Sequence, residues 1–270
     1  MARNLRPTRP APRSAPRTAW GWAWAGVLAG VLPAVVAFAP AHWLAGGVAR
    51  ATQGQVLLLQ PRGTVWTGSA QLVLTGGQAS KDSAALPGRV DWQLRPTWGG
   101  LRARLQAGCC TAEPLQAQVH LRWVGPQITL ADGQSQWPAA LLAGLGTPWN
   151  TLQPQGQLAL QTRALAVQWA AGRMVLSGQA QLDARAMSSR LSTLRPMGSY
   201  RLVLQGGEVP TLALSTLDGA LQLSGSGQWV GNRLRFAGEA SAAPEREAAL
   251  SNLLNIIGRR NGARSIITVG

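Results

Sequence analysis

Apolar and polar side chains alternate along most of the chain after its first fifth. Leu165, Val167 and Trp169, for example, alternate with Ala166 and Gln168. A period of two residues predicts strands with one buried face and one solvated face. The same pattern recurs in residues 56–59, 64–74, 90–94, 101–106, 115–123, 157–161, 174–182, 200–205, 221–225 and 229–236.

Turn signals separate these alternating runs. They are Gly76-Gly77, Pro87-Gly88, Gly99-Gly100, Gly125-Pro126, Asp132-Gly133, Gly206-Gly207, Asp218-Gly219 and Gly231-Asn232. Asp-Gly and Gly-Asn between alternating runs are typical of hairpins. Because the pattern shows no helices long enough for parallel crossovers, it predicts a mainly β domain over residues 51–270, built as an antiparallel meander.

Two short helices and a final strand interrupt or follow this pattern. Residues 137–145 begin near Pro138 and end before Gly146 and Pro148, which is typical of a short helix. Residues 244–257 also start with a proline, and we expect a last strand over residues 265–269.

The second predicted helix has a regular apolar face. It consists of Leu250, Leu253, Leu254 and Ile257, which are spaced at i, i+3, i+4 and i+7. Gly258 is in position to act as a C-cap, and Arg259 and Arg260 lie near the negative end of the helix dipole.

The N-terminal segment has a different pattern. Residues 1–17 combine prolines with five arginines, which predicts a solvated basic tail. Residues 18–49 then contain no Asp, Glu, Lys or Arg. About 20 apolar residues cross a bilayer, and tryptophans flank this segment at both ends. The sequence therefore predicts one transmembrane anchor over residues 18–49, with the basic tail in the cytoplasm.

A cleaved signal peptide is the alternative for this segment. Ala37-Phe38-Ala39 resembles a cleavage site, but Pro40 follows directly and the apolar stretch exceeds an ordinary signal core. We therefore favour an uncleaved anchor.

The charge balance is strongly basic, with a formal net charge of +15 at pH 7. Such a balance is compatible with nucleic-acid binding. However, five arginines lie in the tail, the others are spread along the chain, and Lys81 is the only lysine. Codon bias in a GC-rich genome explains this arginine usage, so we expect no nucleic-acid partner.

Candidate catalytic and metal-binding residues are few. Cys109 and Cys110 are adjacent, which favours two free thiols in a loop, with a bridge between two chains as the alternative. His42 lies at the end of the predicted anchor, and His120 lies on the polar side of its predicted strand. The acidic residues are isolated. We therefore expect no enzyme activity, no metal and no cofactor.

Several segments carry a likeness to a known family. They are Gly63-Thr64-Val65-Trp66-Thr67-Gly68, Leu86-Pro87-Gly88-Arg89-Val90-Asp91-Trp92, residues 148–156, residues 188–191, residues 196–200 and residues 253–260. In this order and spacing, after an apolar anchor, the chain resembles protein N of the bacterial type II (general) secretion pathway.

The resemblance implies an inner-membrane protein of a Gram-negative bacterium. Its periplasmic domain would assist export of folded proteins across the outer membrane through contacts with other secretion subunits. The β-meander is also similar to the periplasmic groove domains of AsmA-type proteins. That likeness implies a sheet curved around an apolar trough, and hence the alternative that the domain binds or passes a lipid or acyl chain.

Seven residues stand out as docking or structural landmarks. Five lie in the C-terminal helix and the segment after it: Leu253, Leu254, Ile257, Arg259 and Arg260. We expect them either to dock a partner or to pack on the protein's own sheet. The other two are Trp149, expected to be a buried anchor, and Asn150, expected to cap a turn.

Overall fold

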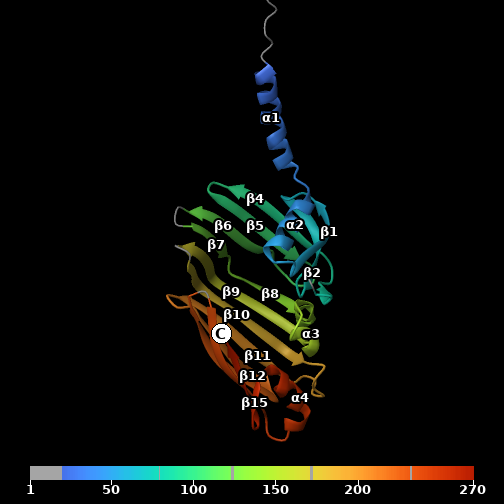
Figure 1. Ribbon diagram of the computed structural model, residues 1–270, viewed down its shortest axis with the longest axis vertical. Helices are drawn as coiled ribbons and strands as arrows, with labels where there is room; N and C mark the ends of the chain where they lie inside the picture. The colour runs from blue at the N-terminus through green and yellow to red at the C-terminus, as the bar shows by residue number, and fades with distance from the viewer. Residues whose placement is uncertain (1–19, 79, 123–124, 171–172, 232) are drawn as a thin grey trace, which may run out of the picture. The chain divides into compact units, whose positions relative to one another are not determined.

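The computed structural model describes residues 20–78, 80–122, 125–170, 173–231 and 233–270 (Figure 1). The predicted basic tail, residues 1–17, lies outside the described residues. The chain divides into two compact units, of which the first ends at Phe38 and the second runs from Ala39 to Gly270.

The described part of the first unit is the helix α1, Trp20–Ala37. Its sequence is apolar on all sides, and large side chains such as Trp22, Leu32 and Phe38 just after it are exposed. Among the described residues, no helix combines the length and the apolar character that crossing a membrane requires. The transmembrane anchor therefore remains a prediction.

Helix α2, Ala41–Ala51, belongs to the second unit. The apolar segment breaks between α1 and α2 because Pro40 lacks a backbone N–H and disfavours helical geometry at the residue before it. The Ala39 carbonyl accepts a hydrogen bond from Val65 N at 2.8 Å, and Ala41 is buried against Trp92. The compact β-rich unit thus starts at residue 39, and the periplasmic domain expected over residues 51–270 stays a prediction.

One sheet of sixteen strands makes up most of the rest of the described second unit. The strands are β1 Val56–Gly63, β2 Thr67–Thr75, β3 Ser83–Ala85, β4 Val90–Thr97, β5 Gly100–Ala107, β6 Leu115–Arg122, β7 Gly125–Leu130, β8 Gly133–Pro138, β9 Gln155–Ala170, β10 Arg173–Ser188, β11 Gly198–Gly207, β12 Thr211–Gly219, β13 Leu221–Val230, β14 Arg233–Ala242, β15 Arg259–Asn261 and β16 Arg264–Val269. Neighbouring strands are antiparallel and follow chain order almost throughout, so the predicted meander is confirmed.

The predicted hairpin at Asp132-Gly133 is wrong. Strands β7 and β8 do not pair with each other; both pair with β9, β7 along residues 165–168 and β8 along residues 157–162. The Asp132 Oδ1 atom instead accepts a hydrogen bond from Ala164 N at 2.6 Å, where β9 bulges. The Asp-Gly pair therefore leads the chain from β7 into β8 along the same neighbouring strand, β9, and does not fold β8 back onto β7.

Strands β9 and β10 are the longest, at 16 residues each, and both are bent. Their register shifts between Ser177 and Gln179, opposite Ala164, whose φ is +47°. Gly178 has φ +81°, and a Cβ there would overlap the Ala164 carbonyl. Bulges of this kind add local twist and bend, which helps the sheet to curl as Figure 1 shows.

Short helical segments lie along one edge of the curled sheet (Figure 1). They are η1, a 3₁₀ helix over Ala139–Leu145, α3, Trp149–Leu152, and α4, Glu247–Ile257. The predicted helix 137–145 is thus shorter, because Trp137 and Pro138 complete β8. The second predicted helix begins three residues later than expected, and Gly258 is its C-cap in an extended conformation.

Candidate functional site

One face of the curled sheet is apolar from strand to strand. Trp92 of β4 lies opposite Leu105 of β5, which lies opposite Leu115 of β6. The same face continues through these antiparallel pairs: Ile128 and Val167, Leu160 and Leu182, Leu182 and Leu202, Leu202 and Leu214, Trp229 and Leu234. The alternation seen in the sequence therefore adds up to one continuous apolar surface.

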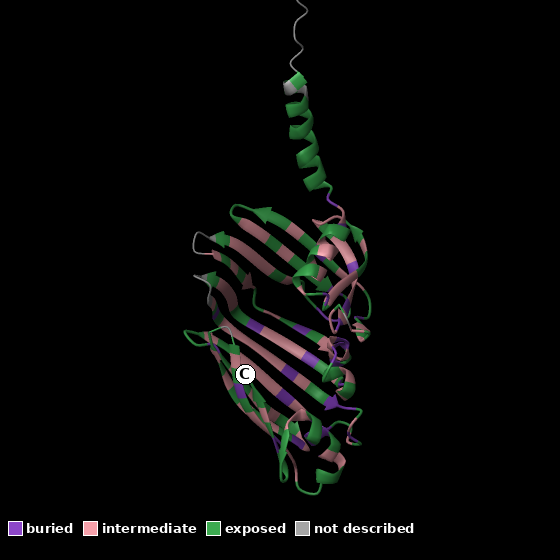
Figure 2. Ribbon diagram, in the orientation of Figure 1, coloured by how far each residue is buried: buried purple, intermediate pink, exposed green. Residues whose placement is uncertain are grey.

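In the C-terminal half of this apolar face, a helix covers one end of the strands, and we call the covered part the sealed half. Helix α4 packs Leu250, Leu253 and Leu254 against it, each no more than 1% exposed, together with Leu221 of β13. The segment after β10 adds Met197 to the same cluster. Figure 2 shows exposed positions alternating with less exposed ones along the strands. Burial of this many large apolar side chains is the main stabilising contribution in this half.

The C-terminal landmarks therefore divide into two groups. Leu253 and Leu254 are buried, and Ile257 is partly buried against the same cluster. Arg259 and Arg260 lie in β15, at the end of the strand order, and are exposed. The two arginines are thus accessible from outside, whereas the two leucines are packed on the protein's own sheet.

Trp149 and Asn150 lie in α3. Trp149 is 37% exposed, so the expectation that it is a buried anchor is wrong. Asn150 Nδ2 donates a hydrogen bond to Asp82 Oδ2 at 2.9 Å, which ties α3 to a loop 68 residues earlier. Asn150 therefore acts as a link between distant loops, and neither this bond nor the one that its Oδ1 accepts from the Thr151 hydroxyl caps its own turn.

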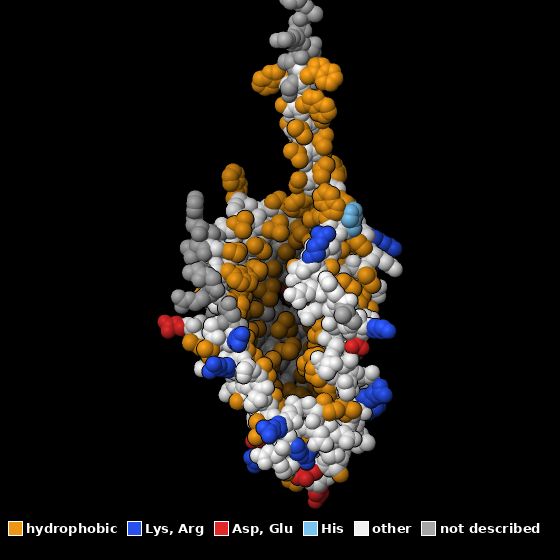
Figure 3. Space-filling model, in the orientation of Figure 1, with side chains coloured by type: hydrophobic (Ala, Val, Ile, Leu, Met, Phe, Trp, Pro, Cys, Tyr) orange, Lys and Arg blue, Asp and Glu red, His pale blue; other side chains and the backbone are white. Residues whose placement is uncertain are grey.

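The N-terminal half of the apolar face is hollow. A cavity of about 350 Å³ lies over β1, β2, β4 and β5, with α2 along one side. Figure 3 shows a hollow lined by hydrophobic side chains, with basic side chains on its rim. Leu105 in its wall is 39% exposed, whereas Trp92 beside it is 2% exposed. We call this space the groove cavity.

Three polar side chains in the wall of the groove cavity, Trp92, Trp137 and Thr111, are already hydrogen-bonded. Trp92 Nε1 donates to the carbonyls of Val65 and Thr64, at 3.1 and 3.3 Å. Trp137 Nε1 donates to Ser135 Oγ at 2.9 Å, and Thr111 Oγ1 bonds to both the amide and the carbonyl of Ala107. The wall thus presents mainly hydrocarbon and aromatic surface to any occupant, with Gln106 as a further polar residue in its lining.

Sequence reasoning missed the residues that shape this cavity from α2. Leu44 and Val48 line it, although the sequence places them at the end of the predicted anchor. The signal that was present is their spacing: Ala41, Leu44 and Val48 fall at i, i+3 and i+7, one face of a helix. Pro40 and tertiary packing, and not a change of charge, separate α2 from α1.

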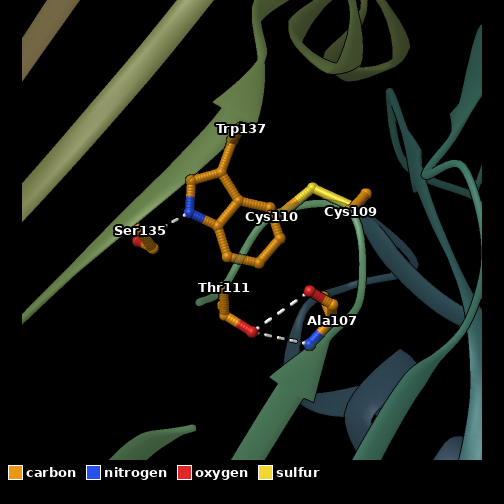
Figure 4. The surroundings of a disulfide bond; sticks show 6 residues. All are labelled: Ala107, Cys109, Cys110, Thr111, Ser135 and Trp137. Atoms are coloured by element: carbon orange, nitrogen blue, oxygen red, sulfur yellow. Dashed lines mark hydrogen bonds between the residues drawn. A yellow bond between two sulfur atoms is a disulfide. The ribbon is translucent and has the colours of Figure 1, made fainter. Parts of the chain in front are cut away.

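The adjacent cysteines form a disulfide, so the expectation of free thiols is wrong. Cys109 and Cys110 lie in the turn between β5 and β6 (Figure 4). Cys110 is 5% exposed and packs against Leu86 and Leu141. Its carbonyl accepts a hydrogen bond from Gln136 N at 2.8 Å. The turn that holds the disulfide is therefore hydrogen-bonded to β8, and Ala107 and Thr111 beside it line the groove cavity.

The opposite face of the sheet is polar and carries a buried carboxylate. Asp183 of β10 is 3% exposed, and its two oxygens accept hydrogen bonds from Arg201 of β11 at 2.8 and 2.9 Å. These bonds hold the pKa of Asp183 below its ordinary value of 3.8. Gln181 and Arg185 add further donors. This network stabilises the sheet from outside.

Tyr200 is the polar exception inside the sealed half. Its hydroxyl is buried without a hydrogen-bond partner among the described residues, and burial raises the pKa of Tyr200 well above 10. His42 is exposed on α2, and His120 pairs across the sheet with Gln127. Within the described ranges, no three His, Cys, Asp or Glu residues are close enough to hold a metal ion. The absence of enzyme activity stays a prediction.

Comparison with known proteins gives one finding. The model of the family described as type II secretion system (T2SS), protein N, matches residues 54–267. These residues include all sixteen strands but the last part of β16, together with η1, α3 and α4. No curated protein and no solved structure gives a significant match.

Proposed function

The chain belongs to the family of type II secretion system protein N, and from that premise we propose that it is a periplasm-facing subunit that supports export by binding other secretion subunits. The observation that carries the proposal is the match over residues 54–267, which covers nearly the whole β-rich unit. In this proposal the protein acts by binding, without catalysis.

We further propose that the N-terminal segment anchors the protein in the inner membrane of a Gram-negative bacterium. Two features support this. Residues 18–49 carry no charged side chain after a tail with five arginines. Helix α1 also exposes apolar side chains around its whole circumference, which a bilayer accommodates and water does not. The basic tail then stays in the cytoplasm and residues 39–270 in the periplasm.

The surface proposed to bind a partner subunit consists of Ile256, Arg259 and Arg260. Ile256 is 43% exposed beside the buried face of α4, and the two arginines belong to the edge strand β15. The other edge strand, β1, contains Pro61 and packs against α2, which makes it a poorer edge for pairing. An acidic patch on the partner suits the arginines.

Charge reversal tests this binding surface. In a strain lacking the gene, we expect the intact chain to restore export and the double variant Arg259→Glu and Arg260→Glu to weaken binding to secretion subunits about tenfold, as loss of two rim charge pairs does. Co-purification from membranes and the amount of exported protein in the medium are the measurements.

The control for this test changes the same charges elsewhere. Arg233→Glu with Arg235→Glu alters two exposed arginines of β14, away from the edge of the sheet. We expect this pair to leave binding unchanged. Equal binding by both double variants contradicts the proposed surface, and normal export without the gene contradicts the proposed function.

A further inference from the structure

We propose that the hairpin of β4 and β5 docks on a bilayer surface that contains anionic phospholipid. The inference rests on the proposed membrane anchor, and it concerns the outer surface at one edge of the sheet, not the groove cavity. Three observations carry it. They are the place where the chain enters the β-rich unit, the exposed side chains at the hairpin tip, and two facing arginines behind that tip.

The β-rich unit begins at the edge of the sheet that carries this hairpin tip. The Ala39 carbonyl accepts a hydrogen bond from Val65 N, and Pro40 bridges to Thr64, in the turn between β1 and β2. Strand β4 pairs antiparallel with β2, so β4 ends at the edge where β2 begins. We call this edge the hairpin rim; the β4–β5 tip lies on the side away from α3 and α4 (Figure 1). Because Ala39 directly follows the first unit in the chain, an anchored α1 keeps the hairpin rim close to the bilayer by covalent connection alone.

Exposed apolar side chains lie at the tip of the β4–β5 hairpin. Trp98 occupies the turn and is fully exposed. Leu121 of β6 is 73% exposed, and its amide donates a hydrogen bond to the Gly99 carbonyl at 2.8 Å, so it lies beside this tip. Indole rings favour the headgroup level of a bilayer, where the ring contacts hydrocarbon and the N–H contacts water. A fluid surface also accepts a projecting ring without a preformed pocket.

Two arginines lie directly opposite each other behind the tip. Arg95 of β4 pairs with Arg102 of β5, and both are exposed on the face of the sheet opposite Trp92. Among the residues that the structure describes, neither arginine forms an ion pair. Like charges directly opposite each other destabilise a sheet, so a nearby anion stabilises this hairpin. Phospholipid phosphates supply that anion, and guanidinium groups bind phosphate strongly.

The spacing between the ring and the arginines matches the interface of a bilayer. Arg95 precedes Trp98 by three residues, or about 10 Å along an extended strand. An arginine side chain is long enough to cover much of this distance, and such side chains extend toward charged groups. With the Trp98 ring at the headgroup level, both guanidinium groups therefore reach the phosphates.

The acidic residues near the hairpin lie at the other ends of its strands. Residues 39–122 contain three of them. Asp91 is the second residue of β4, and Glu113 lies in the connection between β5 and β6. Asp82 accepts a hydrogen bond from Asn150 of α3, at the opposite edge of the sheet. The carboxylates of this segment are thus concentrated away from the hairpin rim, which favours an anionic partner surface at that rim.

Spin labelling of the full-length chain tests the proposal. The chain is reconstituted in nanodiscs of phosphatidylethanolamine and phosphatidylglycerol. Thr97→Cys carries a nitroxide beside the intact Trp98, and Thr193→Cys carries the control label in the exposed connection between β10 and β11, at the opposite edge. Collisions with a water-soluble nickel chelate report exposure to water. We expect the label at 97 to be protected from nickel and the label at 193 to be open to it. Peptide mapping verifies that Cys109 and Cys110 stay joined.

A pair of charge variants tests the part played by the arginines. Arg95→Gln with Arg102→Gln removes the facing charges. Because each arginine near an anionic surface contributes about fivefold, we expect the ratio of protected to open label at 97 to fall about 25-fold. Arg233→Gln with Arg235→Gln removes two exposed arginines of β14, near the far end of the strand order, and we expect no change. Far-ultraviolet circular dichroism checks that both variants fold.

Removal of the ring tests the tip itself. Trp98→Ser takes away the largest apolar side chain of the tip, and we expect the same ratio to fall about tenfold. Trp98→Tyr is the matched control, since tyrosine also favours the headgroup level, and we expect it to keep most of the protection. Both changes are at a fully exposed position, so neither disturbs the packing of the sheet.

The contrary results separate this inference from the anchor on which it rests. A chain that does not co-elute with the nanodiscs overturns the anchor and the docking together. A chain that co-elutes while the labels at 97 and 193 are equally open overturns the docking alone, as expected of a tip that fits a pocket in another protein. Protection at 97 that persists in detergent without phospholipid, or that both arginine pairs change equally, also overturns it. None of these results depends on binding to secretion subunits.

Discussion

The two halves of the apolar face share one register but differ in what lies over it. In the C-terminal half, Leu253 and Leu254 of α4 and Leu221 of β13 are no more than 1% exposed. In the N-terminal half, α2 borders a cavity of about 350 Å³ and Leu105 stays 39% exposed. Alternation in the strands produces the apolar face in both halves. Only the packed helix and loop decide whether that face becomes a core or a cavity.

The strands themselves are adapted to this difference. In the sealed half, β13 and β14 carry Gly225 and Gly238 opposite each other, and the ring of Phe236 lies over them. In the hollow half, the corresponding face of β4 and β5 carries Trp92 and Leu105. Glycine gives room for one large ring to lie flat on the backbone. Bulky side chains instead build the walls of the cavity.

The largest expected loss of stability comes from truncating a buried leucine in the sealed half. Leu254→Ala leaves a void in a fully buried cluster, so we expect a loss of about 3 kcal/mol in the free energy of unfolding. Leu105→Ala removes the same atoms from a half-open wall, and we expect less than about 1 kcal/mol. Urea unfolding of the two variants provides the comparison. Equal losses would contradict the division of the face into sealed and hollow halves.

The next largest loss of stability is expected from adding a side chain to the glycine pair Gly225 and Gly238. A Cβ at Gly225 overlaps the Phe236 ring and comes within 2.8 Å of the Gly238 Cα. We expect Gly225→Ala to lower the free energy of unfolding by about 2 kcal/mol. Gly108→Ala is the matched control, since a Cβ there meets nothing within 4 Å. Thermal unfolding followed by circular dichroism tests the pair, and a similar melting temperature for both variants would count against this packing.

The smallest effect concerns the polar face outside the sealed half. Because the pKa of Asp183 is lowered by Arg201, its stabilising contribution is fully present above the ordinary value of 3.8 and is lost as pH falls through the lower folded-state pKa. Asp183→Asn should cost about 1 kcal/mol at pH 7, since the Arg201 side chain is 38% exposed to solvent.

The pH dependence is checked by comparing urea midpoints at pH 7 and pH 3. The intact chain should lose more stability than the Asp183→Asn variant over this interval, so the difference between them should shrink at pH 3. A difference that stays constant, or grows, would show that the ionised carboxylate is not the stabilising group.

The sequence was informative where a local pattern decides the structure. Alternation predicted the strands, and the i, i+3, i+4, i+7 spacing predicted α4 with Leu250 and its neighbours on one face. Prediction from the sequence failed where contacts between distant segments decide which strands pair. Asp132-Gly133 predicts a hairpin from local sequence. However, β9 is long enough for β7 and β8 to pair with it one after the other, so the two strands do not pair with each other.

The groove cavity could be predicted from the sequence only in part. The alternation of Leu94, Ala103 and Leu105 predicts an apolar face, but nothing local indicates whether a helix will cover it. The same holds for Cys109 and Cys110, whose pairing depends on how the turn between β5 and β6 folds. For both features, the missing information is the tertiary packing of the sheet.

Thiol accessibility tests the central claim, that one apolar face is sealed in one half and open in the other. Leu105→Cys and Leu254→Cys are made separately in the full-length chain, whose described cysteines are joined to each other. Reaction with N-ethylmaleimide is followed by mass spectrometry under native conditions. The account predicts that Cys at 105 reacts at close to the rate in the unfolded chain, whereas Cys at 254 is protected until unfolding. Protection of both thiols, or equal reactivity of both, would contradict it.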